Sequence, residues 1–160
     1  MLVDSHCHLD HLDLSDREGG IDAVLEAAKA RGVSHFLSVA VDMPTSKSLL
    51  ELTAQHDNVF SSVGAHPLQK VQQEVPSVEE LIQLASQPGV VAIGETGLDN
   101  FYSSETIDWQ RASFINHLKA SQQINKPVII HTRDAREETI DLLRQYTPSA
   151  AGVMHCFTES

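Results

Sequence analysis

Cysteine, positive charge and long apolar runs are all scarce in this sequence. The two cysteines, Cys7 and Cys156, are too few for the disulfide framework of a small secreted domain. No basic and apolar leader precedes the first predicted strand, which favours a cytoplasmic protein. No apolar run approaches the roughly 20 residues of a membrane-spanning helix, so we expect a soluble protein without a membrane partner.

Basic residues are half as numerous as acidic ones. The 11 lysines and arginines face 22 aspartates and glutamates, and the net charge is −11. Phosphate backbones are normally gripped by a basic surface, so any nucleic-acid substrate must be held locally. An acidic chain is better suited to divalent cations, which can themselves receive an anionic substrate. The nine histidines strengthen that interpretation.

The apolar pattern predicts one α/β domain over residues 1–160. Short apolar runs that are typical of buried strands alternate with amphipathic segments that are typical of helices. The runs cover residues 2–3, 36–41, 59–63, 90–93, 128–130 and 152–154. We count six strands and five helices. Because the sequence lacks hairpin turn signals, the strands are expected to form a parallel sheet through β-α-β crossovers.

Potential metal ligands follow several of these apolar runs. His6 and His8 are two residues apart, so strand geometry directs both side chains to the same face. Glu95, His131 and His155 each follow the apolar part of a predicted strand. In parallel β/α folds the carboxyl ends of the strands meet at one rim, where active groups collect. Imidazole and carboxylate ligands without thiolate suit zinc, manganese or magnesium, and one such set can hold two ions.

Two further residues are predicted to lie at the mouth of this site. His66 precedes Pro67 at a strand end, where a structural role and a substrate contact are comparably plausible, and we favour the substrate contact. Arg133 follows His131 by two residues and can meet a phosphate, although pairing with Asp134 or Asp99 is an equal alternative.

The remaining histidines and Cys7 are expected to lie outside the site. Strand alternation turns Cys7 away from its histidine neighbours, toward the helical layer. Surface positions are expected for the histidines that begin a strand or lie in a loop or helix, namely His11, His35, His56 and His117.

Several motifs resemble the TatD family of metal-dependent deoxyribonucleases, which belongs to the amidohydrolase-like barrels. They are Val-Asp-Ser-His-Cys-His-Leu-Asp at 3–10, Gly-Ala-His-Pro at 64–67, Gly-Glu-Thr-Gly-Leu-Asp at 94–99, Pro-Val-Ile-Ile-His-Thr-Arg-Asp-Ala at 127–135 and His-Cys-Phe at 155–157. The resemblance implies metal ligation by His6, His8, Glu95, His131 and His155. It also implies that Glu95 is catalytic and bridges two ions, with His66 in the pocket.

The same resemblance implies a TIM-type (β/α) barrel and 3′-to-5′ exonuclease activity on DNA, and on RNA as well, through metal-activated water. The family continues into further β-α units that carry another aspartate ligand, whereas this sequence stops at Ser160. Since a closed barrel takes about 250 residues, we expect an incomplete barrel of about six of eight units. Exposed sheet edges and weak or absent turnover are expected to follow.

Three alternatives stay open from sequence. An amidohydrolase that cleaves a C–N bond shares the barrel and the His-x-His signature, since fold alone does not determine function. An aminoacyl-tRNA ester hydrolase needs the same chemistry. An inactive fragment or interaction module could pair its strand edges with another chain. No obligate protein partner is evident.

Overall fold

The computed structural model describes residues 1–69, 74–146 and 150–155. Its strands are β1 (Leu2–Cys7), β2 (Val33–Ser38), β3 (Val59–Val63), β4 (Val90–Asp99), β5 (Val128–Arg133) and β6 (Gly152–His155). Its α-helices are α1 (Gly20–Lys29), α2 (Met43–Gln55), α3 (Val78–Ala85), α4 (Ile107–Ile124) and α5 (Arg136–Gln145). Two short 3₁₀ turns, Leu9–His11 and Ser104–Thr106, complete the described elements.

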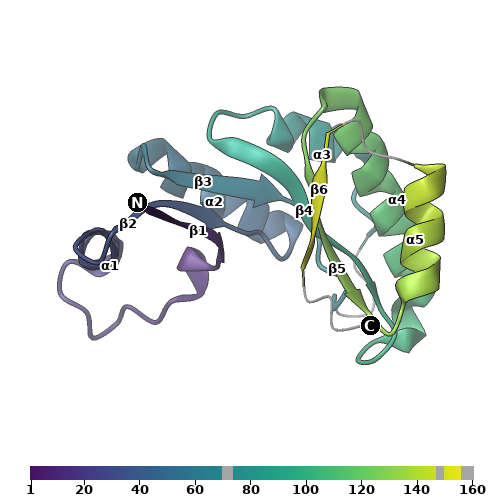
Figure 1. Cartoon of the computed structure of the whole chain (residues 1–160), viewed down its shortest axis with the longest axis horizontal. Helices are drawn as coiled ribbons and strands as arrows, with labels where there is room; N and C mark the ends of the chain where they lie inside the picture. Colours follow the sequence, from purple (N-terminus) through teal and green to yellow (C-terminus); the bar gives the residue numbers. More distant parts are fainter. Residues whose placement is uncertain (70–73, 147–149, 156–160) are drawn as a thin grey trace.

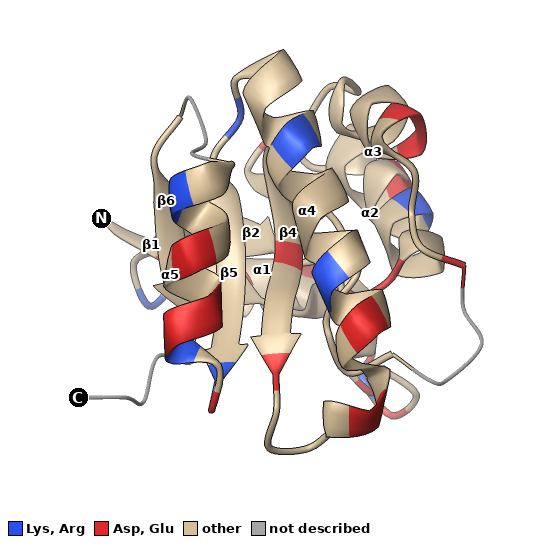
Figure 2. Ribbon diagram, turned by 90° about the vertical axis from the view of Figure 1, so that its right-hand side faces the viewer, with Lys and Arg blue, Asp and Glu red and all other residues tan. Residues whose placement is uncertain are grey.

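The six strands form one parallel sheet in chain order, β1-β2-β3-β4-β5-β6. The sheet curves into an open half-barrel, with α2 to α5 along its outer side and α1 beside β1 and β2 (Figure 1). The arrowheads of β4 and β5 point to the same end of the molecule (Figure 2). This arrangement confirms the predicted fold class, the number of strands and the number of helices.

Local signals explain where helices begin. Asp42 caps α2, because its Oδ1 accepts a hydrogen bond from the Thr45 N–H at 2.6 Å. Ser77 caps α3 in the same way, with its Oγ accepting from the Glu80 N–H at 3.1 Å. The helix that follows Ser77 was expected from its capping-box form, Ser-Val-Glu-Glu. These caps set the start of each helix and therefore its placement on the sheet.

Several strands extend beyond the apolar runs that predicted them, and β2 and β4 depart from the prediction in instructive ways. The second strand was predicted over 36–41 but spans Val33–Ser38. Beyond Ser38, backbone carbonyls accept hydrogen bonds from residues in the loops at the carboxyl end of the sheet. There, the carbonyl of Val39 accepts from the His8 ring at 2.8 Å, and the carbonyl of Val41 accepts from the His66 N–H at 2.9 Å. Strand β4 continues past the predicted 90–93 to Asp99, with a register irregularity between Ile93 and Thr96.

The core lies between the sheet and the outer helices. One cluster joins Leu98 of β4 and Val128 of β5 to Phe114 and Leu118 of α4, and all four are fully buried. The two edge strands are much less covered, since Leu2 of β1 is 60% exposed and Val153 of β6 is 56% exposed. The expected open edges of an incomplete barrel are thus present. Within the described residues, no helix is both long enough and apolar enough to cross a membrane.

Candidate active site

Glu95 occupies the centre of the candidate site. Its side chain is 3% exposed, and it lies within β4 between Gly94 and Gly97. Gly97 has a φ of +138°, and a Cβ there would lie 2.0 Å from the carbonyl oxygen of His131. Only glycine allows β4 and β5 to approach this closely. The close approach brings the Glu95 carboxylate and the His131 ring into one space.

Four imidazoles from four other strands or loops surround this carboxylate. On one side, His6 Nε2 lies 3.3 Å from Glu95 Oε2. On the other side, Glu95 Oε1 is approached by His131 Nδ1 at 3.4 Å, His66 Nε2 at 3.7 Å and His155 Nε2 at 3.8 Å. Two groups of potential ligands result, and both include Glu95. They are His6 with Glu95 and His155, and His66 with Glu95 and His131.

Buried polar atoms without partners show that the site suits a cation. Glu95 Oε1 and His6 Nε2 are both buried, and among the described residues neither has a hydrogen-bond partner. Leaving such atoms unpaired costs free energy, about 1–3 kcal/mol for each neutral group and more for a charged one. Imidazole nitrogen and carboxylate oxygen are the ligand types that zinc and manganese accept in proteins. The donor set therefore fits a divalent ion.

The neighbours of three histidines indicate which ring nitrogen carries the proton. His131 Nε2 lies 2.9 Å from Oδ2 of the fully buried Asp99, so Nε2–H donates and Nδ1 keeps its lone pair toward Glu95. His8 Nδ1 lies 2.8 Å from the carbonyl of Val39, which leaves its Nε2 lone pair free. Such outer partners orient metal-binding histidines. Each ring can therefore turn its other nitrogen toward a cation.

His66 instead carries its proton on the nitrogen that faces Glu95. Its Nδ1 accepts a hydrogen bond from the Leu68 N–H at 3.1 Å, so the neutral ring carries its proton on Nε2. That Nε2–H faces Glu95 Oε1 and lies 3.3 Å from His131 Nδ1. His66 therefore acts as a hydrogen-bond donor in this pocket rather than as a lone-pair donor.

The environment shifts the pKa of several of these groups. Burial alone would raise the pKa of Glu95, but the imidazoles of His131 and His6 hold it well below its usual value. Burial lowers the pKa of His66 to about 4, against the opposing charge of Glu95. Burial would also lower the pKa of His131, but Glu95 and Asp99 raise it. The site therefore holds a carboxylate and a neutral His66 at neutral pH.

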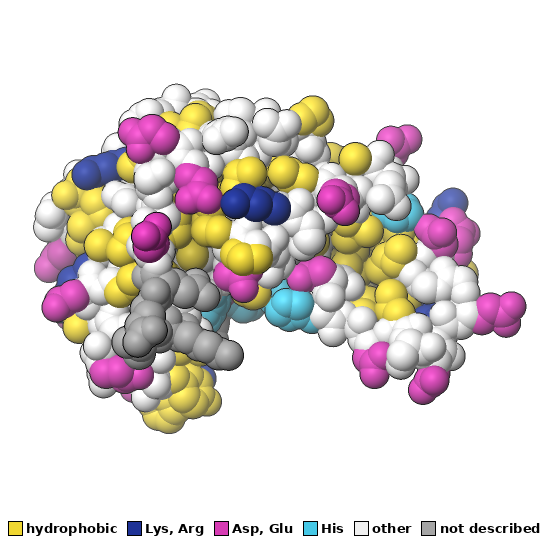
Figure 3. Space-filling view, turned by 180° about the vertical axis from the view of Figure 1, so that it is seen from behind, with side chains coloured by type: hydrophobic (Ala, Val, Ile, Leu, Met, Phe, Trp, Pro, Cys, Tyr) yellow, Lys and Arg dark blue, Asp and Glu magenta, His cyan; other side chains and the backbone are white. Residues whose placement is uncertain are grey.

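The site opens into a cavity of about 590 Å³ at the carboxyl end of the sheet. His8, His66, Glu95, His131 and His155 all line it, so the structure gathers most of the predicted ligands. His8 lies in neither ligand group, although its ring centre is 5.3 Å from that of His6. Histidine side chains are visible in a hollow near the middle of the molecule (Figure 3).

Arg133 also lines the cavity, as expected, but its neighbours are aromatic. Among the described residues it makes no ion pair with Asp134 or Asp99. Its guanidinium lies 4.3 Å from the ring centre of Phe101 and 4.5 Å from that of Tyr102. Asp99 instead accepts from His131, and its side chain is fully buried. The alternative interpretation of Arg133 as an ion-pair partner is therefore wrong.

Two of the histidines expected at the surface are largely or fully buried, and one acid was missed. His56 has a side chain that is 15% exposed. His117 was expected at the surface, but it is fully buried in α4, where its Nε2 accepts from the Ala65 N–H at 3.0 Å. Asp99 was considered only as a partner for Arg133. Asp99 lies opposite Arg133 in the pairing of β4 with β5, and Arg133 follows His131 by two residues. That pairing is the signal that could have placed Asp99 beside His131. Cys7 packs against the cluster of Leu25 and Phe36, as predicted.

Comparisons with known proteins place the chain in a family. The model of the TatD-related DNases matches residues 3–160. The uncharacterised metal-dependent hydrolase YcfH of Escherichia coli K12 is 48% identical over 159 residues, which are 99% of this chain and 59% of that protein. The 3′-5′ ssDNA/RNA exonuclease TatD of Escherichia fergusonii is 36% identical over 138 residues, which are 86% of this chain and 53% of that protein.

Solved structures agree. The crystal structure of YJJV, a TatD homologue from Escherichia coli K12, superposes with a TM-score of 0.87 at 28% identity. The matched region is 99% of this chain and 61% of that one. The chain thus spans about three fifths of the length of the relatives that it matches. The family model covers nearly the whole chain, and the chain therefore belongs to the TatD family of metal-dependent hydrolases.

Proposed function

We propose that this chain forms the metal-binding half of a 3′-to-5′ deoxyribonuclease, with single-stranded DNA, and also RNA, as substrate. The observation that carries the proposal is the buried Glu95 carboxylate between two groups of histidines at the carboxyl end of a parallel sheet. The exonuclease named TatD from Escherichia fergusonii supports the substrate class. We infer that residues 1–160 act as one domain.

The residues that would hold metal are His6, His8, Glu95, His131 and His155. Glu95 belongs to both groups of potential ligands, so its carboxylate would be able to serve two divalent ions. Magnesium, manganese and zinc all accept such oxygen and nitrogen ligands. Divalent ions bound there would activate water and polarise the phosphodiester. No serine or cysteine nucleophile is then required.

The chain's own residues supply binding and orientation. Asp99 Oδ2 lies 2.9 Å from His131 Nε2, and this contact orients the ring so that Nδ1 faces Glu95. His66 presents Nε2–H to the cavity and would donate to a phosphate oxygen. Arg133 is the lining residue whose positive charge can meet the same phosphate. These contacts would place the scissile bond beside Glu95.

The test is metal-dependent shortening of a 5′-labelled single-stranded oligonucleotide by the purified chain, with Mg²⁺, Mn²⁺ or Zn²⁺ supplied separately. In keeping with the weak turnover expected from the sequence, we expect slow formation of products that shorten stepwise from the 3′ end and that disappear with a chelator. Glu95→Gln and the pair His6→Ala with His8→Ala should abolish them. His11→Ala is the matched control, because the His11 ring lies 5.5 Å from that of His8 but pairs with Asp10 and does not line the cavity.

A dipeptide panel run in parallel separates this proposal from the amidohydrolase alternative. An aminoacyl-tRNA substrate separates it from ester hydrolysis. Turnover of either substrate without loss of nucleotides from the oligonucleotide would contradict the nuclease assignment.

A further inference from the structure

We propose that Phe101, Tyr102 and Arg133 form a stacking platform for a nucleobase at the mouth of the site. This inference rests on the proposed nuclease function and names the part of the substrate that the acidic chain recognises. The platform would hold the unpaired bases near the 3′ end of a single strand, beside the phosphodiester at Glu95.

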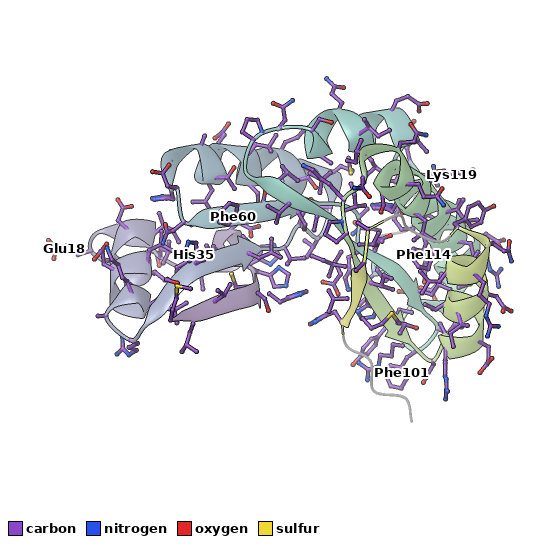
Figure 4. The ribbon with its side chains drawn as sticks, turned by 45° about the horizontal axis from the view of Figure 1, so that its top comes forward. Glu18, His35, Phe60, Phe101, Phe114 and Lys119 are labelled. Carbon is purple, nitrogen blue, oxygen red and sulfur yellow. The ribbon has the colours of Figure 1, made fainter. Side chains whose placement is uncertain are left out.

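The rings of Phe101 and Tyr102 are exposed, although burial of such large apolar side chains would stabilise the fold. Phe101 is 56% exposed and Tyr102 is 58% exposed. Their ring centres are 4.6 Å apart at an interplanar angle of 90°, and the Arg133 guanidinium lies over both rings. Phe101 lies at the tip of the molecule, beyond the strand ends, whereas Phe114 packs among the helices (Figure 4). Tyr102 and Arg133 both line the cavity that contains Glu95.

The platform is fixed rigidly to the catalytic centre. One carboxylate oxygen of Asp99, Oδ1, accepts from the N–H groups of Phe101 at 3.0 Å and Tyr102 at 2.7 Å. The other oxygen, Oδ2, contacts His131 Nε2 at 2.9 Å. A single buried side chain therefore positions both the aromatic pair and a predicted metal ligand. The distance between a stacked base and the scissile bond would thus be set by Asp99.

Hydrogen bonds from two more residues hold this loop in place. The fully buried Gln110 of α4 accepts from the Asp99 N–H at 2.7 Å and donates to the carbonyls of Asp99 at 3.2 Å and Ser103 at 2.7 Å. Asn100 donates its backbone N–H to the Arg133 carbonyl at 2.9 Å. A preorganised loop loses little conformational entropy on binding. These contacts explain how exposed rings can be held ready for a ligand.

The negative net charge of the chain explains why the platform would bind a nucleobase rather than the phosphate backbone of the strand. The chain carries a net charge of −11, so it repels an extended phosphate backbone. Acidic and basic segments are interspersed on the helical face shown in Figure 2. Among the described residues that line the cavity, Arg133 is the one lysine or arginine. Stacking needs no net charge and tolerates every base.

The experiment measures binding, so it does not require turnover. A ten-nucleotide single strand with a 5′ fluorophore and uncleavable phosphorothioate linkages is titrated with the chain in Mg²⁺ at constant ionic strength, and Kd is read from fluorescence anisotropy. A second oligonucleotide is identical except that its last two 3′ nucleotides are abasic. We expect the abasic strand to bind roughly 5- to 100-fold more weakly. Tyr102→Leu and Phe101→Leu should remove most of that difference, and Tyr102→Phe should keep it.

Tyr146→Leu is the matched control, because Tyr146 also lies beneath a cation, Lys119, at 5.6 Å, but does not line the cavity. It should preserve the preference for bases. Equal binding of the two oligonucleotides by the unaltered chain would overturn the platform, as would equal weakening of both by Tyr102→Leu. If a leucine variant does not fold, the comparison on the unaltered chain still decides. Failure to bind either strand would instead refute the proposed nuclease function.

Discussion

His117 offers the sharpest test of how the core supports the site. Its Nε2 accepts from the Ala65 N–H at 3.0 Å, and its Nδ1–H donates to the Ser113 carbonyl at 2.7 Å. Ala65 directly precedes His66, so this hydrogen bond from α4 holds the backbone that carries a pocket residue. Because Nε2 must accept, the ring must be neutral. Protonation of His117 is therefore expected to break the contact with Ala65.

The size of the expected loss of stability in acid follows from the pKa of the His117 ring. Burial lowers the pKa of His117 to about 4, against an ordinary value of about 6.5. A depressed histidine pKa means that the unfolded chain binds the proton first, so the contribution to stability is complete above pH 6.5 and falls as the pH drops toward 4. The full difference corresponds to about 3 kcal/mol, and most of it is lost by about pH 4.5.

The assay is urea unfolding at pH values between 7.5 and 4.5 for the unaltered chain, His117→Leu and His117→Gln. The leucine variant leaves the Ala65 N–H unpaired, so it should be about 1–3 kcal/mol less stable than the unaltered chain at pH 7.5. That deficit should shrink or reverse by pH 4.5, because leucine takes up no proton. Titration of His66 and of the carboxylates occurs in all three proteins and cancels in the differences.

The glutamine variant is the matched control, since it keeps an acceptor for Ala65 but does not titrate. It should recover much of the stability at pH 7.5 and still lack the acid-dependent loss. A stability difference between the unaltered chain and His117→Leu that stays constant across this pH range would refute the reasoning.

Three further predictions concern the metal, the sheet and the core. A divalent ion at 100 times its Kd should stabilise the chain by about 2.7 kcal/mol, and Glu95→Gln should abolish the resulting rise in Tm, measured by differential scanning fluorimetry. Gly97→Ala should destabilise the fold by more than about 2 kcal/mol in urea unfolding, because its Cβ would lie 2.0 Å from the His131 carbonyl oxygen. A change within about 0.5 kcal/mol of zero, which is the usual scatter of neutral surface substitutions, would contradict this. Phe114→Ala should cost about 3–5 kcal/mol by leaving a cavity, and a much smaller loss in the same assay would show that the core closes around it.

Much of the fold could be predicted because its signals are local. Apolar runs of strand length, amphipathic segments of helix length and the cap at Ser77 each depend on neighbouring residues, and all were visible in the sequence. The shift of β2 and the extension of β4 were not visible. The end of β2 depends on carbonyls that serve His8 and His66, and the length of β4 depends on glycines that meet β5.

The sequence alone determined which residues with metal-binding chemistry would meet, since the carboxyl ends of parallel strands share one rim. Only the tertiary structure decided what each would do there. The neighbours of His131 and His66 direct different ring nitrogens toward Glu95, Nδ1 in His131 and Nε2 in His66, and these neighbours lie on other segments of the chain or depend on how a loop turns. The burial of His117 and the double role of Asp99 also depend on contacts between distant segments. Hydrogen bonding and burial are properties of the assembled fold, and no pattern of neighbouring residues encodes them.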